Sequence, residues 1–292
     1  MATAEERVRI LVTGSGGQVG RELVELCGRN GDDVVAADHA ALDVADRDAT
    51  LQAVLAARPD VVVHAAAWTA VDACEGDPGR AFAVNAIGTR NVCEGARRAG
   101  AHLVYLSTDY VFDGTKPEPY DEWDTPNPPS VYGRSKWAGE NEIAAVGDGG
   151  ATVVRISWVC GRYGHNMVKT LLRLAQDGAD PSFVTDQIGH PTIVGDLVPV
   201  LRRLATERRP GLFHVTNQGA VSWFEFARET FAAAGADPER VHPIRTADLD
   251  PPRPAPRPAN SVLDNAALRL AGLALLPDFR ESLPRLVAKL RD

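Results

Sequence analysis

Tyr132 and Lys136, four residues apart, are the pair in this sequence best suited to acid–base chemistry. Positions i and i+4 of a helix share one face, so a phenol and an ammonium with this spacing can point into one cleft. Free tyrosine has a pKa near ~10, and a positive charge nearby lowers that pKa by favouring the phenolate. Such a tyrosine can exchange a proton with a carbonyl oxygen. The spacing is common by chance, so the pair needs support from other residues.

Thr108 provides that support, because it ends an apolar segment, 102–108, that has the composition of a buried strand. Ligands of open parallel sheets bind at the carboxyl ends of the strands. A threonine hydroxyl at that edge could hydrogen-bond the same carbonyl oxygen as Tyr132. We therefore predict a catalytic set of Thr108, Tyr132 and Lys136.

A glycine-rich turn is the second chemical signal. Residues 13–20 read TGSGGQVG between a predicted strand and a predicted helix, which places Gly14, Gly17 and Gly20 at intervals of three. The first glycine allows a tight turn, the second lets the backbone approach a pyrophosphate, and the third allows close helix packing. The helix N-terminus adds free N–H groups and partial positive charge. In this context the pattern predicts a dinucleotide site.

Acidic and amide residues beyond the turn are further candidates for cofactor contacts. Asp38 ends the second predicted strand, where a carboxylate can hydrogen-bond the adenosine 2′-hydroxyl and repel a 2′-phosphate, which favours NADH. The alternative is a solvated aspartate, and His39 beside it could soften the preference. Asp43 and Val44 follow where a loop could touch adenine. Asn85, inside a predicted helix, is a candidate for a water-mediated proton path to Lys136.

The first half of the chain must supply a sheet that positions these residues. Its predicted strands are 8–13, 33–38, 60–66, 102–108 and 152–159, and its predicted helices are 19–29, 47–58, 80–99 and 132–145. The strands are mostly Val, Ile and Ala with little alternation, as in strands covered on both faces. Strands that alternate with helices predict an α/β fold with a doubly wound parallel sheet. We assign residues 1–160 to a Rossmann-like cofactor-binding domain.

Residues 161–292 are predicted to form a smaller, mostly helical substrate-binding region, some segments of which return to the sheet. Its predicted helices and strands are 166–176, 195–206, 223–234, 182–185 and 212–216. The segment 251–258 contains five prolines. It is either a stiff surface loop or a loop laid over a ligand, with Arg253 or Arg257 as anion contacts.

Composition limits the class of protein. The chain has 292 residues, a net charge of −8, 45% hydrophobic and 24% charged residues, as in an ordinary globular protein. The negative charge argues against a nucleic-acid partner. No apolar stretch approaches the ~20 residues of a membrane helix, and no leader is evident, so we expect no membrane partner and a cytoplasmic location. The four cysteines form no metal-ligand cluster, and no metal ligands are predicted.

Together these motifs resemble the extended short-chain dehydrogenase/reductases, and more narrowly the dTDP-4-dehydrorhamnose reductase family. The narrower resemblance rests on AAAWTAVD (65–72), STDYVF (107–112), SWV (157–159), DQIGHPT (186–192) and RPANS (257–261). It implies NADPH- or NADH-dependent reduction of the C4 ketone of dTDP-4-dehydro-β-L-rhamnose, a dTDP-linked 4-keto-6-deoxysugar. It also implies a homodimer, and some members hold Mg²⁺ at a dimer interface, for which no ligands are assigned here.

The resemblance also implies roles for individual residues. Besides the catalytic set and the glycines, it implies cofactor contacts from Gln18, Val19, Ala65, Ala66 and Ala67. It implies substrate contacts from Thr69, Val71, Thr108, Asp109, Tyr110, Trp158 and Arg257. Trp158 could stack on the sugar or nucleobase, or it could pack in the core.

Three departures and three alternatives accompany this interpretation. His39 stands where an Arg often follows the acidic residue, which leaves the choice of cofactor open. His64 stands where family members often have Asn, and Trp68 where Tyr or His is usual. The first alternative is a reductase of another dTDP-4-keto-deoxysugar from an antibiotic-sugar pathway. The second is an epimerase or dehydratase of the same fold. The third is a non-catalytic regulatory subunit resembling that of methionine adenosyltransferase, against which the complete catalytic set weighs.

Overall fold

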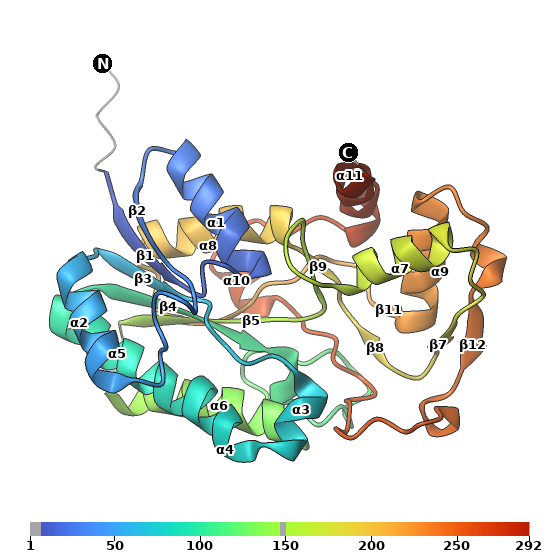
Figure 1. Ribbon diagram of the computed structural model, residues 1–292, viewed down its shortest axis with the longest axis horizontal. Coiled ribbons are helices and arrows are strands. Elements are labelled where there is room, and N and C mark those ends of the chain that lie inside the picture. Colours follow the sequence, from blue (N-terminus) through green and yellow to red (C-terminus); the bar gives the residue numbers. More distant parts are fainter. Residues whose placement is uncertain (1–6, 147–149, 292) are drawn as a thin grey trace.

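A six-stranded parallel sheet forms the centre of the protein (Figure 1). The computed structural model describes residues 7–146 and 150–291. The strand order is β2-β1-β3-β4-β5-β10, and all neighbouring strands are parallel. The strands are β1 (Arg9–Thr13), β2 (Asp33–Ala37), β3 (Val61–His64), β4 (His102–Thr108), β5 (Ala151–Ile156) and β10 (Gly211–His214). The predicted α/β fold is confirmed.

Helices cover both faces of this sheet, because successive side chains of a strand point to opposite faces. Ile10 and Val12 of β1 face one hydrophobic layer, whereas Leu11 faces the other. The first layer is completed by α1 (Gln18–Arg29), α8 (Val194–Thr206) and α10 (Ala266–Leu270). The second is completed by α2 (Arg47–Ala57), α5 (Gly88–Ala99) and α6 (Val131–Val146). Burial on both faces explains why the strands lack polar alternation.

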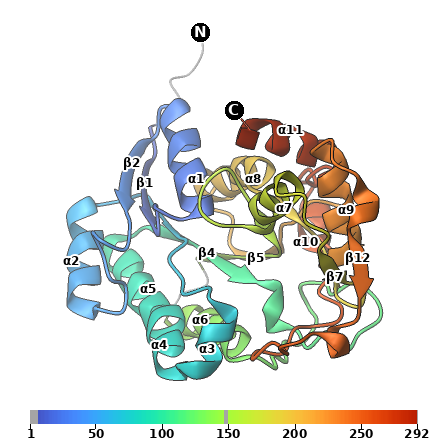
Figure 2. The ribbon, with the colours of Figure 1, turned by 45° about the vertical axis from the view of Figure 1, so that its right-hand side comes forward.

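A second, smaller body is built from residues of the C-terminal part (Figure 2). Its core lies between α7 (Met167–Gln176), α9 (Trp223–Ala233) and α11 (Phe279–Arg291). Three short two-stranded sheets border it: β6 (Val159–Cys160) with β9 (Thr192–Ile193), β7 (Ser182–Val184) with β12 (His242–Ile244), and β8 (Ile188–Gly189) with β11 (Val221–Ser222). The remaining short elements are α3 (Val71–Gly76), α4 (Pro78–Phe82) and the 3-10 turns η2 (Asp109–Val111), η3 (Pro238–Arg240) and η4 (Thr246–Asp248).

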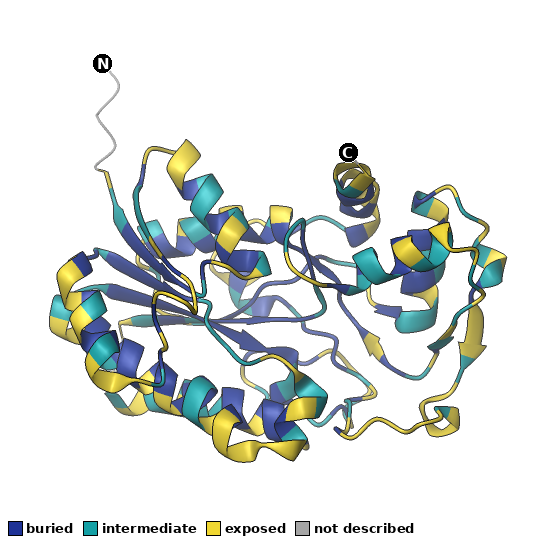
Figure 3. Ribbon diagram, in the orientation of Figure 1, coloured by how far each residue is buried: buried dark blue, intermediate teal, exposed yellow. Residues whose placement is uncertain are grey.

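Burial follows the same division, with dark strands between helices whose outer faces are exposed (Figure 3). Although they follow residue 160, α8 and β10 belong to the large sheet and its cover. The predicted strand 212–216 is therefore an edge strand of that sheet. The domain boundary at residue 160 stays a prediction, and the residues on its two sides share one hydrophobic layer.

Local structure departs from the sequence expectation in two places. The predicted helix 80–99 is interrupted by a π-helical segment, η1 (Ala83–Ile87), between α4 and α5. The predicted strand 152–159 ends at Ile156, because Trp158 adopts a left-handed backbone with φ 43° that an extended strand cannot include. In the ranges that the structure describes, no helix combines the length and apolarity needed to span a bilayer.

Candidate active site

A cavity of about 620 Å³ opens at the carboxyl ends of β1, β3, β4 and β5. One end of the cavity is the glycine-rich turn after β1. At β1 the strand order switches side, because β2 lies on one side of β1 and β3 on the other. Ligands of such sheets bind at this switch point. The predicted residues that line it are Gly14, Gly17, Gln18, Val19, Gly20, Ala65, Ala67, Thr69, Val71, Thr108, Asp109, Tyr110, Tyr132, Lys136 and Trp158.

The glycine-rich turn is shaped for close backbone approach. Gly14 has φ +69°, and a Cβ there would lie 2.5 Å from the backbone nitrogen of Ala66. A Cβ at Gly20 would collide with the carbonyl oxygen of Gly14, so the third glycine lets α1 pack against the turn itself. Gly17 caps α1 with no side-chain hydrogen bond. A helix N-terminus of this kind fits a phosphate group.

Gln18 connects this turn to the segment 161–166. Its Nε2 donates to the carbonyl of His165 at 3.1 Å, and its Oε1 accepts from Gly161 N at 3.2 Å and Asn166 Nδ2 at 3.0 Å. Gly164, His165 and Asn166 consequently line the cavity, which the sequence did not predict. In the sequence Asn166 is recognisable only as the N-cap of a helix. Its side chain accepts from Lys169 N at the start of α7.

Lys136 is placed by α6, which begins just before Tyr132. The side chain of Ser130 accepts the N–H of Gly133, and the Glu75 carboxylate accepts the N–H of Val131. Lys136 Nζ donates to the Leu106 carbonyl at 2.7 Å and lies 4.1 Å from the centre of the Tyr105 ring. Burial lowers the pKa of Lys136 to about 7, against the opposing charge of Glu140.

Tyr132 and Thr108 meet at the same edge. The side chain of Thr108 lowers the pKa of the Tyr132 hydroxyl, against the larger effect of burial. The Thr108 hydroxyl also donates to Asp109 Oδ1 at 3.0 Å and accepts from Tyr110 N at 3.2 Å. Burial raises the pKa of Tyr132 well above its usual value. We expected Lys136 to lower that pKa, but burial dominates here, and the lysine amine is engaged by the Leu106 carbonyl.

Asp109 and Tyr110 form the wall next to this pair. Burial raises the pKa of the Asp109 carboxyl to about 6 and that of Tyr110 to about 12. The Tyr110 ring packs edge-on against Tyr132, with centroids 5.5 Å apart. The wall therefore carries hydroxyl and carboxyl groups in a poorly solvated setting, where hydrogen bonds to a ligand are strong.

Trp158 packs in the smaller core and also borders the cavity, and its stacking on a ligand stays a prediction. Its ring stacks on Trp223 at 3.6 Å with an interplanar angle of 10°. Trp68 is not among the lining residues, and the Arg80 guanidinium lies over its ring at 4.6 Å.

His64 lies beneath the site, at the end of β3. Its ring nitrogens contact the hydroxyls of Thr13 at 2.7 Å and Thr89 at 3.2 Å. Burial, helped by the nearby Lys136, lowers the pKa of His64 to about 3, so the ring is neutral near pH 7. His64, which departs from the family pattern, thus connects β3 with β1 and α5.

Several predicted cofactor contacts lie outside the cavity lining. Asp38 is exposed and directly follows β2. A Cβ built on Gly16 would lie 3.3 Å from the Cβ of Asp38, so Asp38 lies beside the glycine-rich turn. Asp43 is exposed and accepts from Ala45 N. The side chain of Val44 is buried in the layer with α2 and α5, and the adenine contact predicted for this loop stays a prediction. Ala66 is also outside the lining.

Asn85 holds the segment after β3 in place. Its Oδ1 accepts from Trp68 N at 2.8 Å, and its Nδ2 donates to the Trp68 carbonyl at 3.1 Å and to Ser135 Oγ at 2.9 Å. Both amide hydrogens are engaged by these bonds, and the predicted proton path to Lys136 stays a prediction. Asn85 fixes the segment from which Ala65, Ala67 and Thr69 line the cavity.

Arg257 ties the proline-rich segment to the cavity wall. Its guanidinium forms a bidentate ion pair with Asp72 in the first turn of α3, and its charge acts on the nearby Tyr110 hydroxyl. Arg257 itself does not line the cavity. No residue of 251–258 lines the cavity and Arg257 is engaged by protein groups, so the anion contact considered for this segment stays a prediction.

Comparison with known proteins decides the family. The family model described as RmlD substrate binding domain matches residues 8–292. The chain belongs to this family. Its resemblance to the dTDP-4-dehydrorhamnose reductases, and with it the prediction of an oxidoreductase, is confirmed by the relatives that follow.

Three members of the RmlD family illustrate the likeness. A dTDP-4-dehydrorhamnose reductase from Mycolicibacterium smegmatis is 43% identical over 283 residues, 96% of this chain and 85% of that protein. A probable dTDP-4,6-dihydroxy-2-methyloxan-3-one 4-ketoreductase from Streptomyces antibioticus is 42% identical over 280 residues, 94% of this chain and 93% of that protein. The crystal structure of dTDP-4-dehydrorhamnose reductase from Bacillus anthracis in complex with NADP is 38% identical, with a TM-score of 0.93 over 97% of this chain and 100% of that chain.

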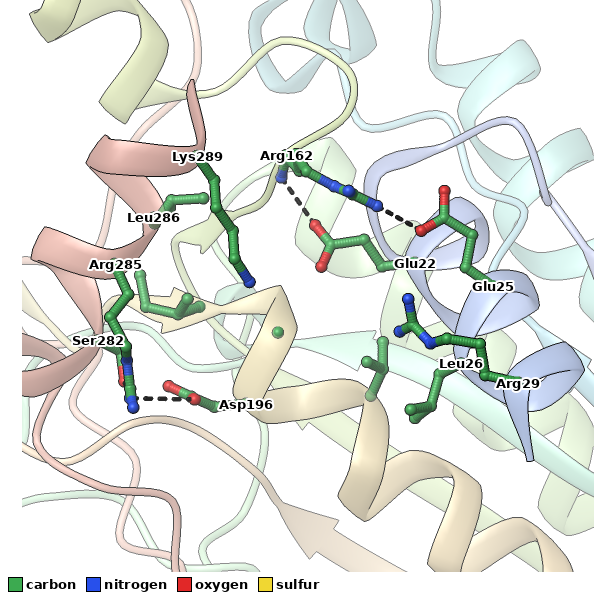
Figure 4. A pocket seen from close by; sticks show the side chains of 13 residues that line it. Glu22, Glu25, Leu26, Arg29, Arg162, Asp196, Ser282, Arg285, Leu286 and Lys289 are labelled. Atoms are coloured by element: carbon green, nitrogen blue, oxygen red, sulfur yellow. Dashed lines mark hydrogen bonds and ion pairs between the residues drawn. The ribbon is translucent and has the colours of Figure 1, made fainter. Parts of the chain in front are cut away.

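The Mg²⁺ that the resemblance implied for some RmlD relatives finds no matching donor set here. Across residues 7–146 and 150–291, no group of three or more His, Cys, Asp or Glu is arranged to hold a metal. A second hollow of about 320 Å³ lies between α1, α8 and α11 (Figure 4). Its carboxylates face cationic or N–H partners, as in Glu25 with Arg162 and Asp196 with Arg285. We derive no step through a metal.

Proposed function

We propose that this protein reduces the C4 ketone of dTDP-4-dehydro-β-L-rhamnose to the alcohol of dTDP-L-rhamnose, with NADPH or NADH. The observation that carries this proposal is the convergence of Thr108, Tyr132 and Lys136 on a cavity that begins at a dinucleotide-type glycine turn. Membership of the RmlD family supports the class of substrate.

The residues present fit a nicotinamide cofactor. The bare N-terminus of α1 and the glycine-rich turn would hold the pyrophosphate, and Lys136 would hold the nicotinamide ribose. When bound, this cofactor supplies a hydride to the ketone carbon. Asp38 supports NADH, whereas the NADP bound by the Bacillus anthracis relative supports NADPH.

The chain's own groups then manage charge and proton. Thr108 and Tyr132 direct hydroxyl hydrogen bonds at the ketone oxygen, where negative charge develops. Tyr132 donates the proton to that oxygen, and its raised pKa keeps the hydroxyl protonated at neutral pH until the stronger base has formed. Thr69, Val71, Asp109, Tyr110 and Trp158 would bind the sugar nucleotide.

The test follows the absorbance of NADH and of NADPH with dTDP-4-dehydro-β-L-rhamnose generated in situ. We expect substrate-dependent oxidation, which Tyr132→Phe reduces by roughly 10²-fold or more while cofactor binding is retained. Turnover near that of the wild type in Tyr132→Phe would rule out the assigned acid. Net oxidation would also exclude an epimerase or dehydratase, which returns its hydride to the product.

A second candidate is reduction of another dTDP-linked 4-keto sugar, which the Streptomyces antibioticus relative supports. Protein that binds cofactor but oxidises none of it with the rhamnose precursor, and does so with a different keto sugar, would favour this candidate. Activity with neither would favour the regulatory-subunit alternative. We also propose a homodimer, a cytoplasmic location, and no nucleic-acid or membrane partner, as the sequence suggested.

A further inference from the structure

Glu140 forms a buried network one helical turn beyond Lys136. The two residues are i and i+4 on α6 and therefore share one face of that helix. The Glu140 carboxylate accepts from Arg155 Nε at 3.0 Å and Nη2 at 2.7 Å, and from the Ser107 hydroxyl at 2.5 Å. The side chains of Arg155 and Glu140 are 3% and 10% exposed.

The network extends across three neighbouring strands at one level. Ser107 of β4 is paired in register with Arg155 of β5, and Arg155 with His214 of β10. Arg155 Nη1 lies 3.4 Å from His214 Nε2. Burial lowers the pKa of His214 to about 3, so the ring is neutral and can accept from the arginine. The buried charges of this row are thus Glu140 and Arg155.

A buried ion pair is poor evidence for a contribution to stability, because desolvation of both charges offsets their attraction. Its position suggests a functional use instead. Lys136 Nζ donates to the carbonyl of Leu106, and Glu140 accepts from the next residue of the same strand, Ser107, which lines the cavity. Successive turns of α6 therefore form hydrogen bonds with consecutive residues of β4 just before Thr108.

We propose that Glu140 is a positioning residue: through Ser107 it fixes the end of β4, and its carboxylate keeps Lys136 in the ammonium form. The role of the Lys136 ammonium in catalysis rests on the proposed reductase function, whereas the effect of Glu140 on Lys136 does not.

The surroundings of Lys136 explain why a counter-charge is needed. The groups that face it are the Tyr105 ring and Leu106 carbonyl of β4, the neutral His64 of β3, and Tyr132 on its own helix. Burial therefore depresses the pKa of Lys136, and the negative charge of Glu140 opposes that depression. Glu140→Gln would remove this charge and leave the Arg155 cation nearby, and both changes disfavour the ammonium.

The sequence allows a direct measurement, because its lysines number four: Lys116, Lys136, Lys169 and Lys289. Lysine labelled with ¹³C at Cε gives few NMR signals, and Lys136→Met assigns the one of interest. In the wild type we expect Lys136 to titrate near pH 7. In Glu140→Gln we expect its midpoint about 1 pH unit lower. The alkaline limb of kcat/KM should move in the same direction.

Glu142→Gln is the matched control. Glu142 lies on the same helix two residues away, in a solvent-facing pair with Arg90, and its removal should leave the Lys136 midpoint unchanged. If Glu140→Gln fails to fold, the double variant Glu140→Gln/Arg155→Met removes the pair without leaving a lone buried charge, and its midpoint should still fall. An unmoved midpoint in either folded variant would overturn the proposal. The titration needs no substrate, so failure of the reductase assay alone would leave it standing.

Discussion

The carboxylate of Asp72 and the guanidinium of Arg257 meet in a two-pronged ion pair, with distances of 2.5 and 2.7 Å, across 185 residues of chain. Asp72 also accepts the N–H of Ala255 at 3.1 Å. The charge of Arg257 in turn acts on Tyr110, whose ring packs against Tyr132. The proline-rich segment is therefore linked to the proposed proton donor through Tyr110.

Asp72→Asn should raise the KM for the sugar nucleotide about 10-fold, a loss of ~1.4 kcal/mol in binding free energy. We expect kcat to stay within about 3-fold of the wild type, because the variant leaves the catalytic set in place. The variant loosens Tyr110 and the segment 251–258, whereas Lys136 keeps its bond to Leu106. Steady-state kinetics would measure the split. Asp180→Asn, which breaks an exposed pair with Arg240, serves as the control. An unchanged KM in Asp72→Asn would show that this ion pair does not shape the sugar site.

Asp38→Asn should increase the ratio of kcat/KM for NADPH over NADH by about 10-fold. The amide can still hydrogen-bond a ribose hydroxyl, but it no longer repels a 2′-phosphate. Asp48→Asn makes the same change of charge on exposed α2 and should leave the ratio as it is. If Asp38→Asn leaves the ratio unaltered as well, Asp38 is the solvated strand-end residue that the sequence also allowed.

Gly14→Ala should abolish cofactor binding, measured by fluorescence titration of the reduced cofactor. Gly100 has the same φ of +69°, but a Cβ there meets nothing within 4 Å. Gly100→Ala should therefore cost only the left-handed conformation, about 1 kcal/mol, and leave the cofactor Kd unchanged. Gly14→Ala adds a collision with the backbone of Ala65 and Ala66, so the turn must shift. Equal Kd values for the two variants would contradict this account.

Asn85→Ala should destabilise the fold by about 2 kcal/mol, because it removes the hydrogen bonds to the partly buried N–H and carbonyl of Trp68 and one of the two bonds of Ser135. We also expect a higher KM for the cofactor, as the cavity wall at 65–69 loosens. Thermal unfolding and kinetics measure the two effects. Asn91→Ala removes another buried amide, one that bonds Val44 and Ala45 away from the cavity. A loss of stability without a change in KM, as expected for Asn91→Ala, would count against the role of Asn85 in the site.

Local patterns carried the prediction of the fold and of the catalytic set. The i, i+4 spacing placed Tyr132 and Lys136 on one helix face, and apolar runs marked the strands of the sheet. Contacts between distant segments left no such pattern. Gln18 meets His165 and Asn166 more than 140 residues away, and Trp158 meets Trp223 through a backbone turn that spacing does not encode.

Besides contacts between distant segments, the sequence did not reveal how deeply each side chain is buried. The spacing of Tyr132 and Lys136 suggested a lowered tyrosine pKa, but that pKa depends on how far the site excludes water. The surroundings of the Val44 and Asn85 side chains were hidden for the same reason. Their place in the chain suited a ligand contact, while their surroundings commit one to the core and the other to Trp68.

The return of β10 and α8 to the large sheet constrains how this scaffold can diversify. A chain cut after residue 160 would leave β5 as a bare edge and uncover the apolar layer that holds Val104 and Leu106. The two halves therefore cannot be exchanged between relatives as independent modules. New substrate preferences on this scaffold would arise in the segments that line the cavity, after β3 and β4 and between β5 and α8, with the shared layer inherited whole.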